Sequence, residues 1–152
     1  MDAFTKAIAA VEKKCLALLK ARRYKIGTLP NKLPVKGVYL FSQDGKALYV
    51  GRTNNMYKRL QYHTRNNHNQ ATFAFLLARR KTGKKKATYQ KAGSRSDLLT
   101  QPRFLNAFNK ARDAIRKMDV QFIAEANANR QALLEICAAM RTKAKCNDFD
   151  NH

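Results

Sequence analysis

The sequence KGVYLFSQDGKALYVGRTNNMYKRLQYH, residues 36–63, decides the fold of this chain. Within it, residues 38–41 and 47–50 are short runs of apolar, β-branched and aromatic side chains. The segment between them, SQDGK, has the composition and length of a hairpin loop. The stretch therefore predicts two antiparallel strands joined by a tight turn.

The length of the turn decides which residues face each other across this hairpin. A three-residue loop with Gly45 in the left-handed conformation would place Tyr39 opposite Tyr49, with both phenols on one face. A two-residue turn of Asp44 and Gly45 would shift the register by one residue and place the two rings on opposite faces. The residues alone leave both registers open.

A helix is predicted directly after the second strand, beginning near Met56 and capped by one of the polar residues 53–55. On this helix Arg59 and His63 are four residues apart, so they share a face about one turn apart. A guanidinium can hold a phosphate through two hydrogen bonds, and an imidazole titrates near neutral pH. This pair of side chains indicates phosphoryl chemistry rather than packing.

Three short motifs together resemble the GIY-YIG nuclease family: Gly37-Val38-Tyr39, then Tyr49-Val50-Gly51-Arg52-Thr53, then Asn55, Arg59 and His63. Valines stand in place of the two isoleucines that name the family, and both changes keep an apolar β-branched residue. The resemblance implies an α+β fold, with a small three-stranded antiparallel sheet flanked by helices. It also implies that the two tyrosines face one pocket, which favours the three-residue loop.

The family needs an acidic residue on a later helix, and Glu135 is the candidate. Residues 120–123 read as a third strand, and Asn127 or Asn129 can cap a helix that runs through residues 130–140. Glu135 is the only charged residue between positions 132 and 140. A helix that is apolar nearly all round is expected to be buried, where a carboxylate needs a partner, a metal ion or a proton.

By resemblance, Glu135 would be the single protein ligand of a divalent metal ion. Mg²⁺ suits such sparse ligation because it keeps several of its waters, and Mn²⁺ is expected to substitute for it. The alternative is that Glu135 reaches solvent or pairs with a neighbouring arginine. Glu125 is the weaker candidate, because the end of a strand is expected to be solvated.

The resemblance also implies a mechanism of phosphodiester hydrolysis by an activated water. Tyr39 would act as general base, and His63 would take its proton or hold the phenol in place. Arg59 would stabilise charge on the phosphate, and Tyr49 would orient the phosphate or the water. An asparagine shortly after the catalytic helix completes the site, for which Asn147 fits best and Asn151 is the fallback.

The charge of the chain indicates a polyanionic partner, which we take to be DNA. The 152 residues carry a formal charge of +21, with a pI near 10.4. Charge alone does not separate DNA from RNA. A membrane partner is disfavoured, since no apolar run approaches the roughly 20 residues needed to span a bilayer. The predicted nucleic-acid-binding residues are Arg52, Arg79, Arg80, Lys81, Lys84, Lys85, Lys86, Lys91 and Arg95.

The length is consistent with one domain, residues 1–152, with an N-terminal helix at about 1–24 and a basic insertion at about 79–118. Further helices are predicted at 71–78 and from Pro102 onward. No signal peptide is recognised, and three cysteines without a disulfide framework favour a reducing, cytoplasmic setting.

The sequence thus predicts a metal-dependent DNA endonuclease. The alternative is a protein of the same fold that binds structured or duplex DNA without cutting it. A role in restriction, repair, mobile elements or toxin action stays open, as does the choice between monomer and homodimer.

Overall fold

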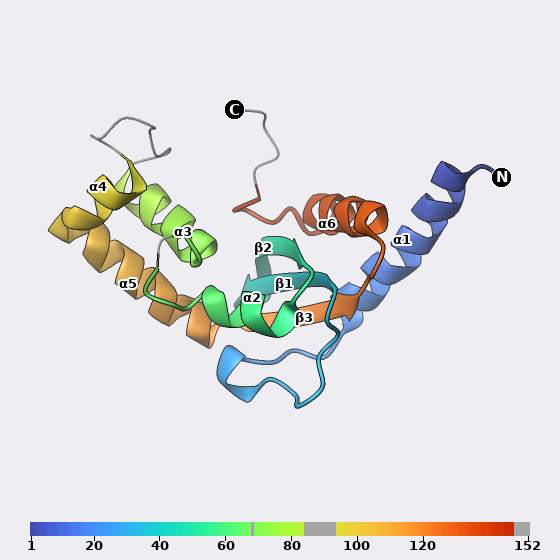
Figure 1. The fold of residues 1–152 in the computed structure, drawn as a ribbon, viewed down its shortest axis with the longest axis horizontal. Helices are drawn as coiled ribbons and strands as arrows, with labels where there is room; N and C mark the ends of the chain where they lie inside the picture. The colour runs from blue at the N-terminus through green and yellow to red at the C-terminus, as the bar shows by residue number, and fades with distance from the viewer. Residues whose placement is uncertain (68, 84–93, 148–152) are drawn as a thin grey trace. The chain divides into compact units, whose positions relative to one another are not determined.

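The computed structural model describes residues 1–67, 69–83 and 94–147 (Figure 1). The chain divides into two compact units. The sheet unit comprises Met1–Lys58 with Met118–His152, and the helical unit comprises Arg59–Lys117. Two such units can belong to one domain, so the single-domain prediction stays a prediction.

The sheet unit contains a three-stranded antiparallel sheet with strand order β2-β1-β3. Figure 1 shows α1 and α6 beside this sheet. This arrangement confirms the predicted α+β class and the third strand. The bounds of its elements are α1 Ala3–Lys20, the 3-10 helix η1 Ile26–Thr28, β1 Gly37–Gln43, β2 Lys46–Thr53, β3 Asp119–Ala124 and α6 Ala128–Thr142.

The core of the sheet unit lies between one face of the sheet and the helices α1 and α6. Val38, Leu40 and Val50 point to this face from neighbouring strands, because residues two apart or directly paired share a side. They pack against one apolar stripe of each helix, including Leu18 and Leu134, all at most 3% exposed. The aromatic side chains of β1 therefore point to the opposite face.

The observed hairpin turn is the two-residue Asp44-Gly45 turn, so the favoured three-residue loop is wrong. Both turn residues have positive φ, at 52° and 77°, the combination that suits a tight hairpin. Ser42 pairs with Ala47, but Phe41 then pairs with Tyr49, which leaves Leu48 as an extra residue. This bulge shifts the register by one residue and returns the tyrosines to one face.

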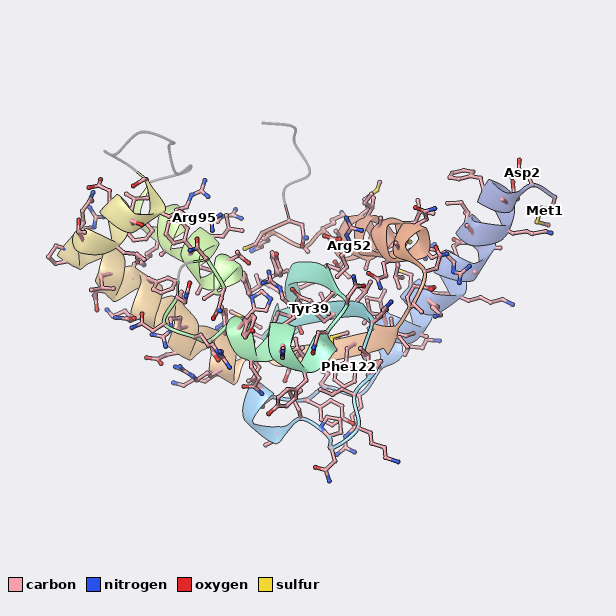
Figure 2. The ribbon with its side chains drawn as sticks, in the orientation of Figure 1. Met1, Asp2, Tyr39, Arg52, Arg95 and Phe122 are labelled. Atoms are coloured by element: carbon pink, nitrogen blue, oxygen red, sulfur yellow. The ribbon has the colours of Figure 1, made fainter. Side chains whose placement is uncertain are left out.

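The pairing of Tyr39 also differs from the prediction. Tyr39 lies opposite Gly51 on β2, and opposite Phe122 on β3. Figure 2 labels Tyr39 and Phe122 on their strands. The inference that both phenols share a face is therefore supported, although the residues that oppose them were wrongly predicted.

Two glycines permit close approaches within this sheet. A Cβ on Gly37 would lie 2.0 Å from the carbonyl oxygen of Ile123, which is backbone and cannot rotate away. A Cβ on Gly51 would lie 2.2 Å from Oη of Tyr39, because the phenol ring lies over this glycine. Glycine is therefore required sterically at both positions.

α2, Met56–Tyr62, begins in the sheet unit and ends in the helical unit. Asn55 is its cap, since the Asn55 Oδ1 accepts from the Lys58 N–H at 3.2 Å. The Met56 N–H also donates to the Val35 carbonyl at 2.8 Å, which fixes the start of the helix near β1. The predicted helix start is thus confirmed, with the third of the proposed caps.

The helical unit contains α3 Thr72–Thr82, α4 Arg95–Thr100 and α5 Pro102–Lys117. Phe75 of α3 packs against Phe104 and Phe108 of α5, with ring centroids 5.1 and 6.3 Å apart. The predicted helix at 71–78 continues for one further turn, and α4 was not predicted. None of the helices in the described ranges is long and apolar enough to cross a membrane.

Candidate active site

The two tyrosines of the hairpin lie next to each other in the sheet unit. Their ring centroids are 6.4 Å apart, with the planes tilted by 37°. Tyr39 is 1% exposed, whereas Tyr49, on the edge strand β2, is only half-buried. Tyr49 is therefore the phenol better placed to meet a ligand from solvent.

The outer edge of β2 is covered by the segment that follows α6. Asn147 Oδ1 accepts from the Val50 N–H, and its Nδ2 donates to the Val50 carbonyl, each at 2.7 Å. The Cys146 N–H donates to the carbonyl of the bulged Leu48 at 2.8 Å. The Asn147 amide thus imitates a neighbouring strand and fixes the backbone directly after Tyr49.

Replacing Asn147 with alanine is expected to lower the free energy of unfolding by about 1–3 kcal/mol, because two backbone groups of an edge strand lose their partners. The measurement is urea unfolding at neutral pH. Asn147→Asp keeps an acceptor for the Val50 N–H but points an oxygen at the Val50 carbonyl, so it should not restore stability. Wild-type stability in both variants would contradict this role.

Glu135 and Arg52 form an ion pair in the sheet unit, with Oε2 and Nε 3.1 Å apart. Figure 2 labels Arg52, which lies toward α6. The Glu135 side chain is 20% exposed, and its pKa is raised above the ordinary value, because burial outweighs the attraction of Arg52. The carboxylate is thus incompletely compensated by its arginine, which favours the approach of a further cation.

A hollow of about 260 Å³ lies next to this ion pair. Its lining contains charged and amide groups that can hydrogen-bond a phosphate or sugar. The hollow is lined by Arg52, Thr53, Asn54 and Gln131.

Gln131 was missed by the sequence analysis. It is 4% exposed, and its Nε2 donates to the Glu125 carbonyl at 2.6 Å and to Asn54 Oδ1 at 3.3 Å. It therefore connects α6 to the turn after β2. The available signal was its spacing, because a residue four positions before Glu135 lies on the same helix face.

Glu125 is buried rather than solvated, which corrects the expectation for this strand end. Its side chain is 2% exposed and pairs with Lys14 at 3.3 Å and Arg130 at 3.2 Å. Burial alone would raise its pKa, but the Asn127 N–H, Arg130 and Lys14 together hold the pKa below its usual value. Glu125 is fully engaged in the fold, so Glu135 remains the better metal-binding candidate.

α6 is not buried all round, contrary to the expectation from its apolar sequence. Leu134 and Ala138 are fully buried, but Ile136 and Met140 are 41% and 72% exposed. The cap prediction is resolved in favour of Asn127, whose side chain accepts from the Arg130 N–H. The alternative raised for Glu135, pairing with an arginine, is what the structure shows.

Arg59 and His63 belong to the helical unit. The Arg59 guanidinium donates to the Gln70 carbonyl at 3.3 Å and to Thr72 Oγ1 at 2.8 Å, so two of its nitrogens hold the start of α3 and the chain just before it. His63 directly follows the last residue of α2 and is fully buried. α2 therefore ends one residue before His63, so the prediction that Arg59 and His63 lie on one face of the same helix is wrong by one residue.

The His63 imidazole lies edge-on to Phe73 of α3, with ring centroids 6.2 Å apart. Burial, followed by the nearby charge of Arg59, lowers the pKa of His63 well below its usual value. The ring is therefore neutral at physiological pH, and one of its nitrogens is able to accept a hydrogen bond.

The stability of the protein is expected to fall as the pH drops from about 6.5 to 5. In this window the unfolded chain protonates His63 and the folded chain does not, so stability decreases by up to about 1.4 kcal/mol per pH unit. Urea unfolding of wild type and His63→Gln over this range measures the effect. The difference between them should vary with pH, and parallel curves would contradict the low pKa. Glu125 and Asp119, whose pKa values are lowered, contribute below this window.

The predicted nucleic-acid-binding residues of the helical unit are placed on helices where the structure describes them. The last turn of α3 carries three of them, and Gly83 ends the helix with a φ of 77°. Basic side chains suit this position, because they complement the partial negative charge of a helix C-terminus. The three are Arg79, Arg80 and Lys81, whereas Lys84, Lys85, Lys86, Lys91 and the fallback Asn151 lie outside the described residues.

Arg79 and Arg95 form a partly buried, like-charged pair. Burial and the charge of Arg95 both lower the pKa of Arg79. The Arg95 guanidinium also lies over the ring of Phe75, 5.1 Å from its centroid. Two neighbouring cations, of which Arg95 lies over an aromatic ring, attract an anionic group.

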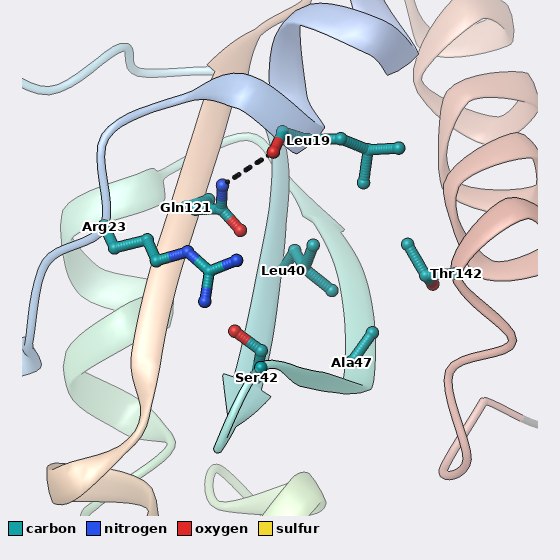
Figure 3. Close-up of a pocket in the computed structure, with 8 residues that line it drawn as sticks. Leu19, Arg23, Leu40, Ser42, Ala47, Gln121 and Thr142 are labelled. Atoms are coloured by element: carbon teal, nitrogen blue, oxygen red, sulfur yellow. Dashed lines mark hydrogen bonds between the residues drawn. The ribbon is translucent and has the colours of Figure 1, made fainter.

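A second cavity, of about 210 Å³, lies on the helix-covered face of the sheet (Figure 3). Gln121 donates to the Leu19 carbonyl there, and the buried Ser42 hydroxyl has no partner among the residues that the structure describes. No predicted catalytic residue lines this cavity, so it is separate from the candidate site. Its lining is Leu19, Arg23, Leu40, Ser42, Gly45, Ala47, Gln121 and Thr142.

Comparison with known families identifies one matching segment. Residues 35–101 match the family model described as the GIY-YIG catalytic domain. This match confirms that the segment resembles the GIY-YIG nuclease family, as its motifs indicate. No curated protein and no solved structure matches the chain. The match includes both tyrosines, Arg59 and His63, whereas Glu135 and Asn147 lie beyond it.

Proposed function

We propose that this protein is a metal-dependent endonuclease that hydrolyses phosphodiester bonds in DNA. The observation that carries the proposal is that the Tyr39 and Tyr49 rings lie next to each other on one sheet face within the matched segment. Phenols suit this chemistry because each can donate or accept a hydrogen bond at a phosphate or a water.

In the proposed reaction, Tyr39 removes a proton from the attacking water. His63 takes up the phenol proton or holds the phenol in place, and its lowered pKa keeps the ring in the neutral form that can accept a hydrogen bond, although it also makes the ring a weaker base. Tyr49, which is half-buried at the sheet edge, orients the phosphate. Arg59 stabilises the charge that builds on the phosphate oxygens, a role in which a fixed donor is worth a few kcal/mol.

Glu135 is the residue that would hold the metal ion. Among residues 1–67, 69–83 and 94–147, no three His, Cys, Asp or Glu side chains gather closely enough to form a protein cage for a cation. A single carboxylate with a raised pKa fits Mg²⁺, which keeps most of its waters, and Mn²⁺ would replace it. When bound, the ion supplies charge stabilisation at the leaving oxygen.

DNA is the proposed substrate because the helical unit is densely positive. Residues 59–117 contain fifteen lysines and arginines against two acidic residues. Arg52, which lines the hollow beside Glu135, and the Arg79–Arg95 pair are the described groups best suited to contact phosphates. A dimer that reads a palindromic site is one form that such an enzyme can take.

A second function is supported by the contacts of Arg59. Its guanidinium is engaged with Gln70 and Thr72, as expected of a residue that stabilises the fold. A chain in which Arg59 stays committed to these contacts would bind DNA without cutting it. This is the competing proposal.

The test is incubation of the purified protein with supercoiled plasmid and Mg²⁺, beside an EDTA control, an RNA substrate and two tyrosine variants. Tyr49→Phe should lose most of the nicking activity. Tyr57→Phe, which removes a phenol that is 60% exposed on α2, should cut like wild type. Plasmid that is bound but left intact with either Mg²⁺ or Mn²⁺ would establish the non-cutting function instead.

A further inference from the structure

The carbonyl of Thr64 is held by two arginines of α5. Arg112 Nε and Arg116 Nη2 each donate to this one oxygen at 2.9 Å. Thr64 is 8% exposed and directly follows His63. Two guanidinium groups on a single backbone oxygen are more than a loop needs for solvation alone.

The position of this carbonyl explains why it needs donors. The last carbonyls of a helix have no partner within the helix. After α2, the N–H groups of Thr64 and Arg65 return to Gln61 and Tyr62, which tightens the chain into a final turn. The Thr64 carbonyl lies just beyond that turn, two residues after the last residue of α2, and accepts from both arginines. Cationic donors near this end of α2 also complement the helix dipole.

Both arginines are themselves held in place by α5. Arg112 donates to Asn109 Oδ1 at 3.0 Å and lies 5.9 Å from the ring centroid of Phe108. Arg116 pairs with Asp113 through its Nη1. Each guanidinium therefore has one side fixed on its own helix and one group left to hold Thr64.

We infer that Arg112 and Arg116 are positioning residues for His63, an inference that rests on the proposed nuclease function. Phe73 of α3 contacts the imidazole ring, and the two arginines fix the adjacent backbone. α3 in turn packs on α5 through Phe75 and its aromatic partners. α5 thereby sets both the ring and the main chain of the proposed catalytic histidine.

The expected effect of Arg112→Ala combined with Arg116→Ala is a fall in kcat of about 10- to 100-fold, with little change in KM, because small displacements of a catalytic group have costs of this size. Arg112→Lys, with Arg116 left intact, should keep more activity than the double alanine variant, since a lysine can still donate to the Thr64 carbonyl. Arg103→Ala, which removes an exposed arginine near the start of α5, is the matched control.

A pH readout separates positioning from simple support of the fold. Loss of the two arginines should let the imidazole reach water, so the pKa of His63 should rise toward its ordinary value. NMR titration of the histidines, with His63→Gln to assign the signal, follows this pKa in a protein that need not cut DNA. The acid limb of kcat/KM should move in the same direction.

Three results would overturn the inference. One is an unchanged His63 pKa in the double variant. Another is a rise in KM with kcat intact and a weaker dependence of DNA binding on salt, which would make the arginines phosphate contacts. The third is loss of stability alone, with normal kcat below the melting temperature. Failure of the wild-type protein to cut any DNA would instead refute the proposed function, and the titration would still test the positioning.

Discussion

Glu135→Gln should lower DNA cleavage by about a thousandfold, because a metal ion at a leaving oxygen supplies several kcal/mol of charge stabilisation. The amide keeps the shape of the side chain but cannot replace the carboxylate as a ligand of Mg²⁺. The measurement is the single-turnover nicking rate of supercoiled plasmid over a range of Mg²⁺ and Mn²⁺ concentrations. Addition of EDTA to the wild-type protein should have the same effect.

The same substitution should leave the protein at least as stable as wild type at pH 7. The folded state raises the pKa of Glu135, so ionisation is more costly in the folded chain than in the unfolded chain. This group therefore lowers wild-type stability as the pH rises above about 4.5, and the glutamine variant avoids that loss. The two unfolding curves should converge toward pH 4.

Glu12→Gln is the matched control for this experiment. Glu12 lies on α1, is 58% exposed and also pairs with an arginine, Arg141 of α6. Its removal should leave cleavage unchanged. If Glu135→Gln retains wild-type activity with Mg²⁺, the metal assignment is wrong and a different residue must hold the ion.

Gly37→Ala should have the largest effect on stability, at about 3 kcal/mol or more. The new Cβ would lie 2.0 Å from the Ile123 carbonyl oxygen, so β1 and β3 would have to separate where they pair. Urea unfolding, or the yield of soluble protein where folding fails, measures this effect. The loss arises from overlap with backbone, which no rotamer change relieves.

Gly27→Ala provides the comparison for Gly37→Ala. A Cβ on Gly27 meets no atom within 4 Å, so this change should cost little. Gly51→Ala should have an effect on stability between these two, because its Cβ would displace the side chain of Tyr39 rather than the backbone. It should reduce cleavage more than stability. Equal stability of the Gly37 and Gly27 variants would show that the strand spacing is not what requires glycine at position 37.

Local sequence signals predicted most of the elements of this fold. The apolar runs of β1, β2 and β3 were recognised from their composition, and α2 and α6 from their asparagine caps. Such signals act between residues a few positions apart, so one sequence is enough to read them. The motif around Tyr39, Tyr49 and Arg59 was likewise recognisable, and it lies within the matched family domain.

The register of the hairpin was decided by tertiary structure. Asp44 and Gly45 form a two-residue turn, which by itself would place the two tyrosines on opposite faces. The extra residue Leu48 shifts the register, so Tyr49 lies on the same face as Tyr39. The bulge is supported from outside the hairpin, because Cys146 and Asn147 bind the backbone on both sides of Tyr49. Contacts from nearly one hundred positions away cannot be read from the local pattern.

Glu125 and Glu135 also separate what the sequence determined from what the tertiary structure decided. The sequence identified Glu135 as an acid on an apolar helix, but it placed Glu125 in solvent. The structure buries Glu125 between Lys14 and Arg130 and leaves Glu135 with Arg52 beside a hollow. By itself the sequence determined which residue types are available to the site. The tertiary structure decided which of them are neutralised by the fold, because burial and ion pairing depend on groups that only folding brings together.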